Sequence, residues 1–132
     1  MLFKGTQLAS ASQDKTILIW DTNTRTCIRR LRGHAAAVYC LDAEGDVLVS
    51  GSADKTILTW KFSTGESLTT IKGHKGTVYC LKLVGNILVS GSADRTIKVR
   101  CFALTLKLVC LLLCLCFILK NLFLFLLSGM EC

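Results

Sequence analysis

The chain has 132 residues, which leaves room for one small domain. Its net charge of +7 is spread unevenly, because residues 1–100 hold 14 of the 16 Lys and Arg and 8 of the 9 Asp and Glu. The basic residues are scattered there and offset by interspersed Asp and Glu, which argues against a nucleic-acid partner. Five of the eight cysteines fall in residues 101–132, the apolar tail, and no secretory signal opens the chain. These features argue against a secreted disulfide scaffold and favour a reducing, cytoplasmic setting.

A repeat of 40 residues organises the first hundred residues. The pair Gly33-His34 returns as Gly73-His74, and residues 48–57 return at 88–97 with one substitution. An earlier copy begins at Leu8 and keeps the same register. A fixed period of this length is typical of repeat folds, in which each unit covers its faces with its neighbours.

The middle copy predicts four strands. Apolar and polar residues alternate over residues 38–43, 47–52, 56–61 and 67–72, and turn-forming residues separate these segments at 44–46, 53–55 and 63–66. Four antiparallel strands in each unit are typical of a propeller blade. Cys40 and Cys80 share one position of the repeat, where a small buried residue is expected.

This pattern resembles the WD-repeat family. The resemblance is carried by the Gly-His pairs, the Ser-x-Ser-x-Asp turns, Trp20-Asp21 and the degenerate Trp60-Lys61, and it covers residues 2–100. It implies an all-β fold, an incomplete WD-repeat β-propeller of four-stranded antiparallel blades. The blades are expected to be partial at 1–32, full at 33–72 and partial at 73–100, within one region at 1–100. The apolar tail at 101–132 is expected to be helical and not part of the propeller.

The resemblance also implies a hydrogen-bonded structural tetrad of His, Ser, Asp and Trp in each blade. The middle blade has all four members, whereas Arg100 stands at the Trp position of the third blade and the His of the first blade would lie before Met1. The matching residues are His34, Ser50, Asp54 and Trp60, then His74, Ser90 and Asp94, and finally Ser10, Asp14 and Trp20. Buried imidazole and indole groups need hydrogen-bond partners, so the expected role is structural.

Catalytic and metal-binding alternatives are weaker. His34, Ser50 and Asp54 have the residue types of a hydrolase triad, but their recurrence in successive blades indicates a structural motif and no catalytic residue is assigned. Cys110, Cys114 and Cys116 lack the paired spacing of a zinc site and have no His nearby. No metal and no cofactor are therefore predicted.

A protein partner is expected on the face that carries the Gly-His loops. The resemblance places candidate contacts at Gln13, Lys75 and Thr77, among several alanines, on a face without aromatic or Arg anchors. The cluster Arg29, Arg30 and Arg32 lies in a predicted outer strand, where charge discourages pairing with another chain.

The repeat pattern breaks at Arg100, and three interpretations of the segment beyond this residue stay open. Residues 108–127 are apolar except for Lys120 and Asn121, long enough for a membrane anchor at the end of a cytosolic propeller. The second interpretation is a read-through or gene-model product without independent function. The third is a strand that packs on the exposed blade, although the segment lacks the alternation of a strand.

The sequence therefore predicts a non-catalytic scaffold for protein–protein interaction. The alternative is the same module tethered to a membrane. Because too few blades are present to close a ring, self-association or complementation by a partner's blades is also expected.

Overall fold

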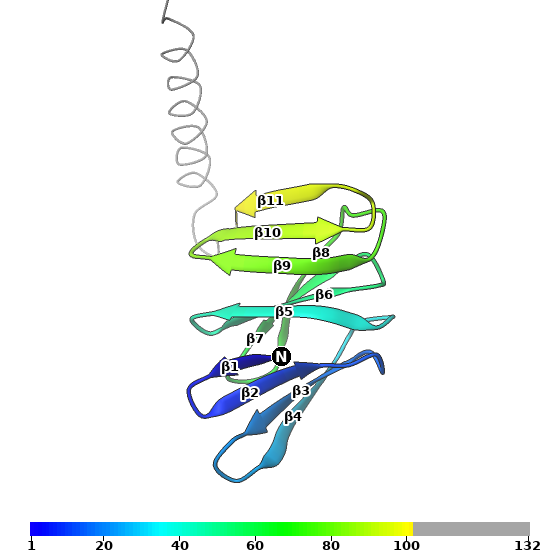
Figure 1. Cartoon of the computed structure of the whole chain (residues 1–132). Coiled ribbons are helices and arrows are strands. Elements are labelled where there is room, and N and C mark those ends of the chain that lie inside the picture. Colours follow the sequence, from blue (N-terminus) through cyan, green and yellow to red (C-terminus); the bar gives the residue numbers. More distant parts are fainter. Residues whose placement is uncertain (102–132) are drawn as a thin grey trace, which may run out of the picture. The chain divides into compact units, whose positions relative to one another are not determined.

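The computed structural model describes residues 1–101, which form eleven strands in three antiparallel sheets (Figure 1). The first sheet contains β1 (Leu2–Lys4), β2 (Gln7–Ala11), β3 (Thr16–Asp21) and β4 (Thr26–Arg32), in this order. The second contains β5 (Val38–Glu44), β6 (Val47–Ser52), β7 (Ile57–Lys61) and β8 (Ser67–Ile71), also in order. The third contains β9 (Val78–Val84), β10 (Ile87–Ser92) and β11 (Ile97–Cys101).

The architecture confirms the predicted all-β fold of antiparallel blades. The strand predicted at 47–52 is found there as β6, and the other three strands of the middle copy differ from the prediction by one residue at one end. Each strand pairs with the next one along the chain, so that every sheet is a meander. β4 is an edge strand, as predicted for the segment that carries the three arginines.

The chain divides into two units, Met1–Arg100 and Cys101–Cys132, of which the structure describes the first and Cys101. Within residues 1–101, no helix is long and apolar enough to cross a membrane. The proposed anchor at 108–127 and the cysteines at 110, 114 and 116 lie outside the described residues.

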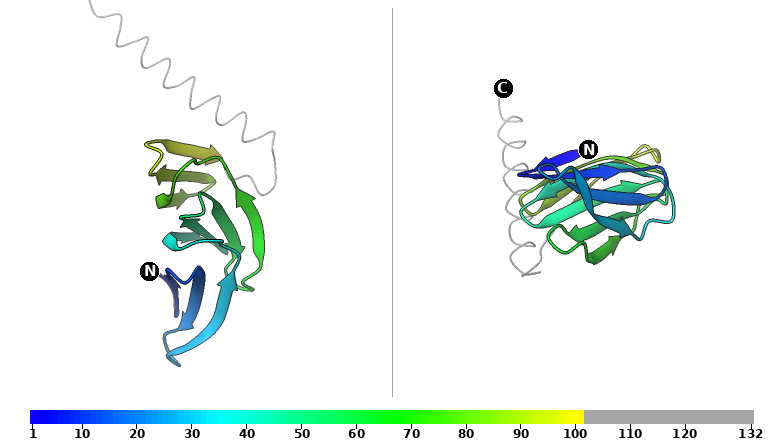
Figure 2. Two further views of the ribbon diagram at one scale, coloured as in Figure 1. Left: turned by 90° about the vertical axis from the view of Figure 1, so that its right-hand side faces the viewer. Right: turned by 90° about the horizontal axis from the view of Figure 1, so that it is seen from below.

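The first and second sheets are held together by an apolar core between their faces. Figure 2 shows the sheets following one another in chain order. The first sheet contributes Ala9, Ile17, Ile19 and Leu31, and the second contributes Val38, Leu48, Leu58, Trp60 and Phe62. Because every one of these side chains is buried, neither sheet is stable with this face in water.

The second and third sheets pack together through the same repeat positions as the first and second sheets do. Val49 and Ile57 of the second sheet are the counterparts of Ala9 and Ile17, 40 residues on, and they pack on Val78, Leu83 and Leu88. Polar contacts reinforce this interface. The Asp42 carboxylate accepts a hydrogen bond from the backbone N–H of Leu83 at 2.8 Å and forms an ion pair with Lys82 at 3.0 Å.

The third sheet differs from the other two, and this corrects one expectation from the sequence. Cys40 and Cys80 occupy the same repeat position, at which a buried residue is expected in both copies. Cys40 is half-buried under the third sheet, and this burial raises the pKa of its thiol to about 12. Cys80 is exposed, because no described sheet covers the face on which it lies. Position in the repeat alone therefore does not decide burial.

Packing between sheets predicts an asymmetry between two equivalent glycines. A Cβ at Gly51 would lie 2.5 Å from Cys40 Sγ and 2.7 Å from Val78 Cγ1, whereas one at Gly91 would meet only Cys80 Sγ, at 2.7 Å. Gly51→Ala is expected to lower the free energy of unfolding by about 1–3 kcal/mol through overpacking. Gly91→Ala is the control, because the exposed Cys80 can rotate into solvent. Urea unfolding of the two variants measures the difference, and equal losses would contradict this packing.

Candidate functional site

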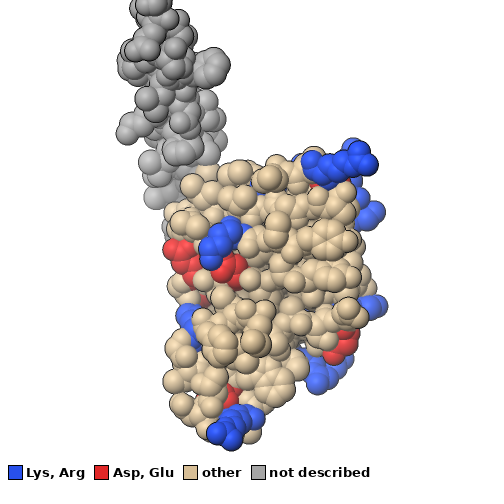
Figure 3. All heavy atoms as spheres, in the orientation of Figure 1, with Lys and Arg blue, Asp and Glu red and all other residues tan. Residues whose placement is uncertain are grey.

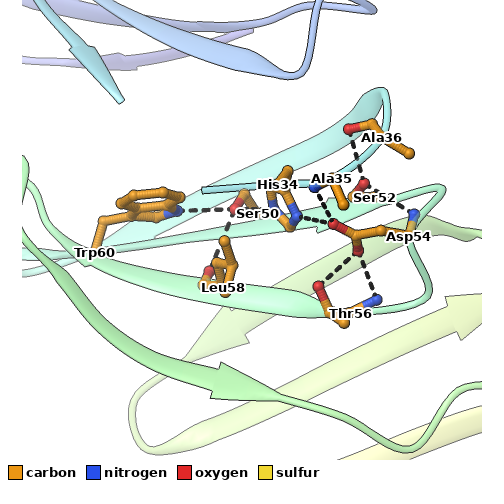
Figure 4. A network of polar contacts seen from close by, with 9 residues as sticks. All are labelled: His34, Ala35, Ala36, Ser50, Ser52, Asp54, Thr56, Leu58 and Trp60. Carbon is orange, nitrogen blue, oxygen red and sulfur yellow. Dashed lines mark hydrogen bonds and ion pairs between the residues drawn. The ribbon is translucent and has the colours of Figure 1, made fainter. Parts of the chain in front are cut away.

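A chain of hydrogen bonds crosses the second sheet (Figure 4). The indole N–H of Trp60 donates to Ser50 Oγ at 2.8 Å, and Ser50 Oγ lies 2.8 Å from His34 Nε2. His34 Nδ1 lies 2.8 Å from Asp54 Oδ2. Residues from β6, β7 and the loop before β5 are thus joined, and these are the four residues of the predicted middle tetrad.

The donors and acceptors fix the direction of this chain. An ionised Asp54 only accepts, so Nδ1 of His34 carries a proton. With its proton on Nδ1, the neutral imidazole accepts at Nε2, so the one hydroxyl proton of Ser50 is donated to Nε2 at 2.8 Å, and the Leu58 carbonyl is the longer contact at 3.3 Å. The assigned polar atoms of the tetrad are therefore satisfied without water or a ligand. Gly33 makes room for the indole, because a Cβ there would lie 2.9 Å from the Trp60 ring.

Asp54 anchors a tight turn as well as the imidazole. Its Oδ1 accepts from the Thr56 backbone N–H at 2.9 Å and the Thr56 hydroxyl at 2.6 Å, while Oδ2 accepts from the Ala35 N–H at 2.9 Å. Burial disfavours the charged carboxylate, but the hydrogen bonds from Thr56, His34 and Ala35 outweigh it and lower the pKa of Asp54. The turn needs this support, because Lys55 has a positive φ of 70°.

The third sheet repeats the site with one change. His74 lies 2.9 Å from both Asp94 Oδ2 and Ser90 Oγ. Hydrogen bonds led by that of the Thr96 hydroxyl hold the pKa of Asp94 well below its ordinary value. Arg100 lies over Gly73 as Trp60 lies over Gly33, and it donates to the Lys72 carbonyl at 2.7 Å. The guanidinium thus occupies the place of the indole but bonds the backbone.

The first sheet holds the remaining predicted residues in two separate pairs. Trp20 donates to Ser10 Oγ at 2.9 Å. Asp14 Oδ1 accepts from the backbone and hydroxyl of Thr16 at 3.0 and 2.6 Å. The two pairs are not joined by a His among the described residues.

The tetrad geometry does not suit chemistry on a substrate. Ser50 is fully buried and its oxygen already accepts the indole N–H, so the hydroxyl is not accessible as a nucleophile. In the part of the chain that the structure describes, no group of three or more His, Cys, Asp or Glu is arranged to hold a metal ion. What this arrangement does is hold two strands and two loops in register.

One of the predicted contact residues, Thr77, lies two residues before a member of an aromatic pair that sequence reasoning missed. Gln13 and Lys75 are exposed and Thr77 is half-buried. The Thr77 carbonyl accepts from the Ala93 N–H at 2.9 Å, which joins the turn after β10 to the start of β9. Two residues further on, Tyr79 lies against Tyr39 of the neighbouring sheet, with ring centroids 5.5 Å apart and ring planes at 57°.

Each tyrosine is the extra residue of a β-bulge. Val38 pairs with Ser52 and Cys40 with Gly51, so Tyr39 has no partner across the strand pair. Tyr79 has the same place between Val78 and Cys80. The bulge turns both rings outward, and they are 48 % and 58 % exposed. The interruption of alternation by the run Val-Tyr-Cys-Leu was the signal in the sequence.

Comparison with known proteins settles the family. The profile described as "WD domain, G-beta repeat" matches residues 2–21, 25–61 and 65–100. The chain belongs to the WD-repeat family. Members of this family generally serve protein–protein interaction and not catalysis.

Individual relatives match over a single WD repeat. "Nuclear distribution protein PAC1" of Arthroderma benhamiae is 59% identical over 34 residues, 26% of this chain and 7% of that protein. "Mitochondrial division protein 1" of Aspergillus clavatus is 42% identical over 40 residues, 30% of this chain and 6% of that protein. This chain thus spans a small part of the length of either relative.

Solved structures that resemble the chain include designed proteins. The computationally designed Ika4 protein superposes with a TM-score of 0.72 at 35% identity, over 77% of this chain and 64% of that one. The designed Ika8 protein gives 0.71 at 36% identity, over 76% of this chain and 31% of that one.

Because both carboxylate oxygens of Asp54 accept hydrogen bonds, replacement of Asp54 by Asn is expected to lower the stability of the fold. In Asp54→Asn, either orientation of the side chain turns an NH₂ group toward hydrogen-bond donors. We expect a loss of about 1–3 kcal/mol in the free energy of unfolding at pH 7. Asp14→Asn is the matched control and should cost less, because the hydrogen bonds that Asp14 accepts from Thr16 use one oxygen only.

Acid titration tests the same carboxylate through its pKa. The folded-state pKa of Asp54 lies below the ordinary value of 3.8, so its stabilisation is complete above that value and is lost as the pH falls toward the folded-state pKa. Stability measured between pH 7 and pH 2 should therefore fall more steeply in the unsubstituted protein than in Asp54→Asn. If the free energy of unfolding fell equally steeply with falling pH in both proteins, the folded state would not stabilise the charged carboxylate of Asp54.

Proposed function

We propose that the chain is a non-catalytic protein-interaction scaffold that binds its partner through the tyrosine pair, Tyr39 and Tyr79. The observation that carries the proposal is the bulge in both β5 and β9, which brings two exposed aromatic rings together across a sheet boundary. Membership of the WD-repeat family supports the general class of function.

Tyrosine is a residue type well suited to a protein-binding surface. Tyrosine offers a large apolar ring at a small cost in side-chain entropy, and its hydroxyl stays available for a hydrogen bond. Residues of this kind carry much of the binding energy at interfaces between proteins. The rings already lie against each other, so a partner that covers them meets a preorganised patch and not two mobile side chains.

The surroundings favour a protein partner over a nucleic acid. Figure 3 shows that the face in view is mostly uncharged, with its Lys and Arg dispersed and interspersed with Asp and Glu. A nucleic-acid partner requires clustered cations for the phosphate backbone. The groups near the pair are the small Ala37 and Ala53, whose backbones are hydrogen-bonded at 2.9 Å, and the polar Thr77. Such a rim lets a partner's backbone approach the rings closely.

Site-specific photo-crosslinking tests the proposal. A photoreactive phenylalanine analogue placed at position 39 of the full chain should capture a partner protein in cells, and one at position 68 should not. Leu68 is the matched position, because it is an exposed apolar residue at a bulge, but on the outer strand β8. The captured protein is then identified and purified.

Affinity measurements on the captured protein complete the test. Tyr39→Ala or Tyr79→Ala should weaken binding by about 2 kcal/mol, roughly 30-fold, which is typical of a hot-spot residue. Leu68→Ala should leave the affinity unchanged. Equal weakening by all three substitutions, or capture from position 68 alone, would refute the tyrosine site.

A further inference from the structure

The third sheet presents an apolar face whose counterpart in the second sheet is fully covered. Val49 and Ile57 of the second sheet pack under the third sheet, and Cys40 and Val47 pack beside them. The residues 40 positions later are Val89, Ile97, Cys80 and Ile87. Ile57 is 2 % exposed, whereas Ile97 is 75 % exposed. The third sheet thus presents the same apolar positions that the second sheet uses to bind its neighbour. No described residue covers them.

The first sheet presents the other half of the same interface. The third sheet binds the second through Leu81, Leu83 and Leu88. The residues 80 positions earlier are Met1, Phe3 and Leu8. Leu83 is 5 % exposed, whereas Phe3 is 65 % exposed and Met1 is also exposed. Both ends of the three-sheet unit therefore carry exposed apolar residues at positions that are buried between the sheets.

We infer that the Ile97 face of one copy of this chain docks on the Phe3 face of a second copy, head to tail. The two interfaces inside the chain show that this pairing of faces is stable, since both use the same repeat positions. Two copies of three sheets give a ring of six, within the range of about four to eight blades at which propellers close. Twofold closure uses both open faces of both copies, which leaves neither in water.

The sequence favours a second copy of the chain over the apolar tail as the partner of the Ile97 face. The Phe3 face has the apolar positions that the Ile97 face binds within the chain, at the spacing of the repeat. Residues 102–132 contain neither a Gly-His pair nor a Ser-x-Ser-x-Asp turn. Lys82, the one cation of β9, already pairs with Asp42 at 3.0 Å and does not bring an unpaired charge to the interface. The inference does not depend on the proposed tyrosine site.

Native mass spectrometry and sedimentation velocity of the full chain test the ring. The unsubstituted chain should be a dimer at micromolar concentration. Ile97→Glu and Phe3→Glu should each raise the dimer dissociation constant by about tenfold or more, because each places a charge in an apolar interface. Both residues are exposed in the single chain, so neither substitution disturbs its core, and circular dichroism verifies this. Leu68→Glu, on the outer strand β8, should leave the dimer intact.

Mixing the two variants separates head-to-tail docking from the alternatives. Copies with Phe3→Glu keep an intact Ile97 face, and copies with Ile97→Glu keep an intact Phe3 face. An equimolar mixture should therefore form a heterodimer with one intact interface, although each variant alone is largely monomeric. Three results would overturn the inference: a monomeric unsubstituted chain, loss of association with only one of the two variants, or association that survives both substitutions, which would assign it to the tail.

Discussion

The burial of one sheet's apolar face under the next is the interaction on which the rest of this structure depends. Each sheet alone would leave side chains such as Ile57 or Leu48 in water, and the polar contacts between sheets are too few to replace that contribution. The tetrad acts at a different level. It joins strands within one sheet, so that the face offered to the neighbour has a fixed shape. The Trp60 ring serves both levels, because it packs in the core between the first two sheets and donates its N–H to Ser50.

Much of this organisation could be predicted from the sequence, because it repeats. The period of 40 residues places His34, Ser50, Asp54 and Trp60 at positions that recur, and alternation in the middle copy predicts its four strands. Burial was less predictable. Cys40 and Cys80 have the same local sequence, yet one is half-buried and the other exposed, because burial here depends on a neighbouring sheet and not on the strand itself. A pattern within one repeat contains no information about whether a further repeat comes after it.

The tyrosine pair was missed for a different physical reason. A strict alternation assigns one side of the strand to Tyr39 and the other to its neighbours, but the bulge inserts it as an additional residue with no partner. Its direction then depends on backbone geometry and not on the period of two. The contact between Tyr39 and Tyr79 requires in addition that two sheets place their bulges side by side, which is a property of the assembled unit.

Arg100 shows how far a tetrad tolerates loss of a member. The guanidinium covers Gly73 and donates to the Lys72 carbonyl, so the segment before His74 remains tied to β11. Ser90 loses the indole donor, but its hydroxyl still lies 2.9 Å from His74 and 3.5 Å from the Lys98 carbonyl. The hydrogen bonds that fix the His and the Asp turn are thus independent of the indole. What the Trp adds is apolar area at the interface with the preceding sheet, because Trp60 packs in the core shared with the first sheet, whereas the core between the second and third sheets contains no such ring.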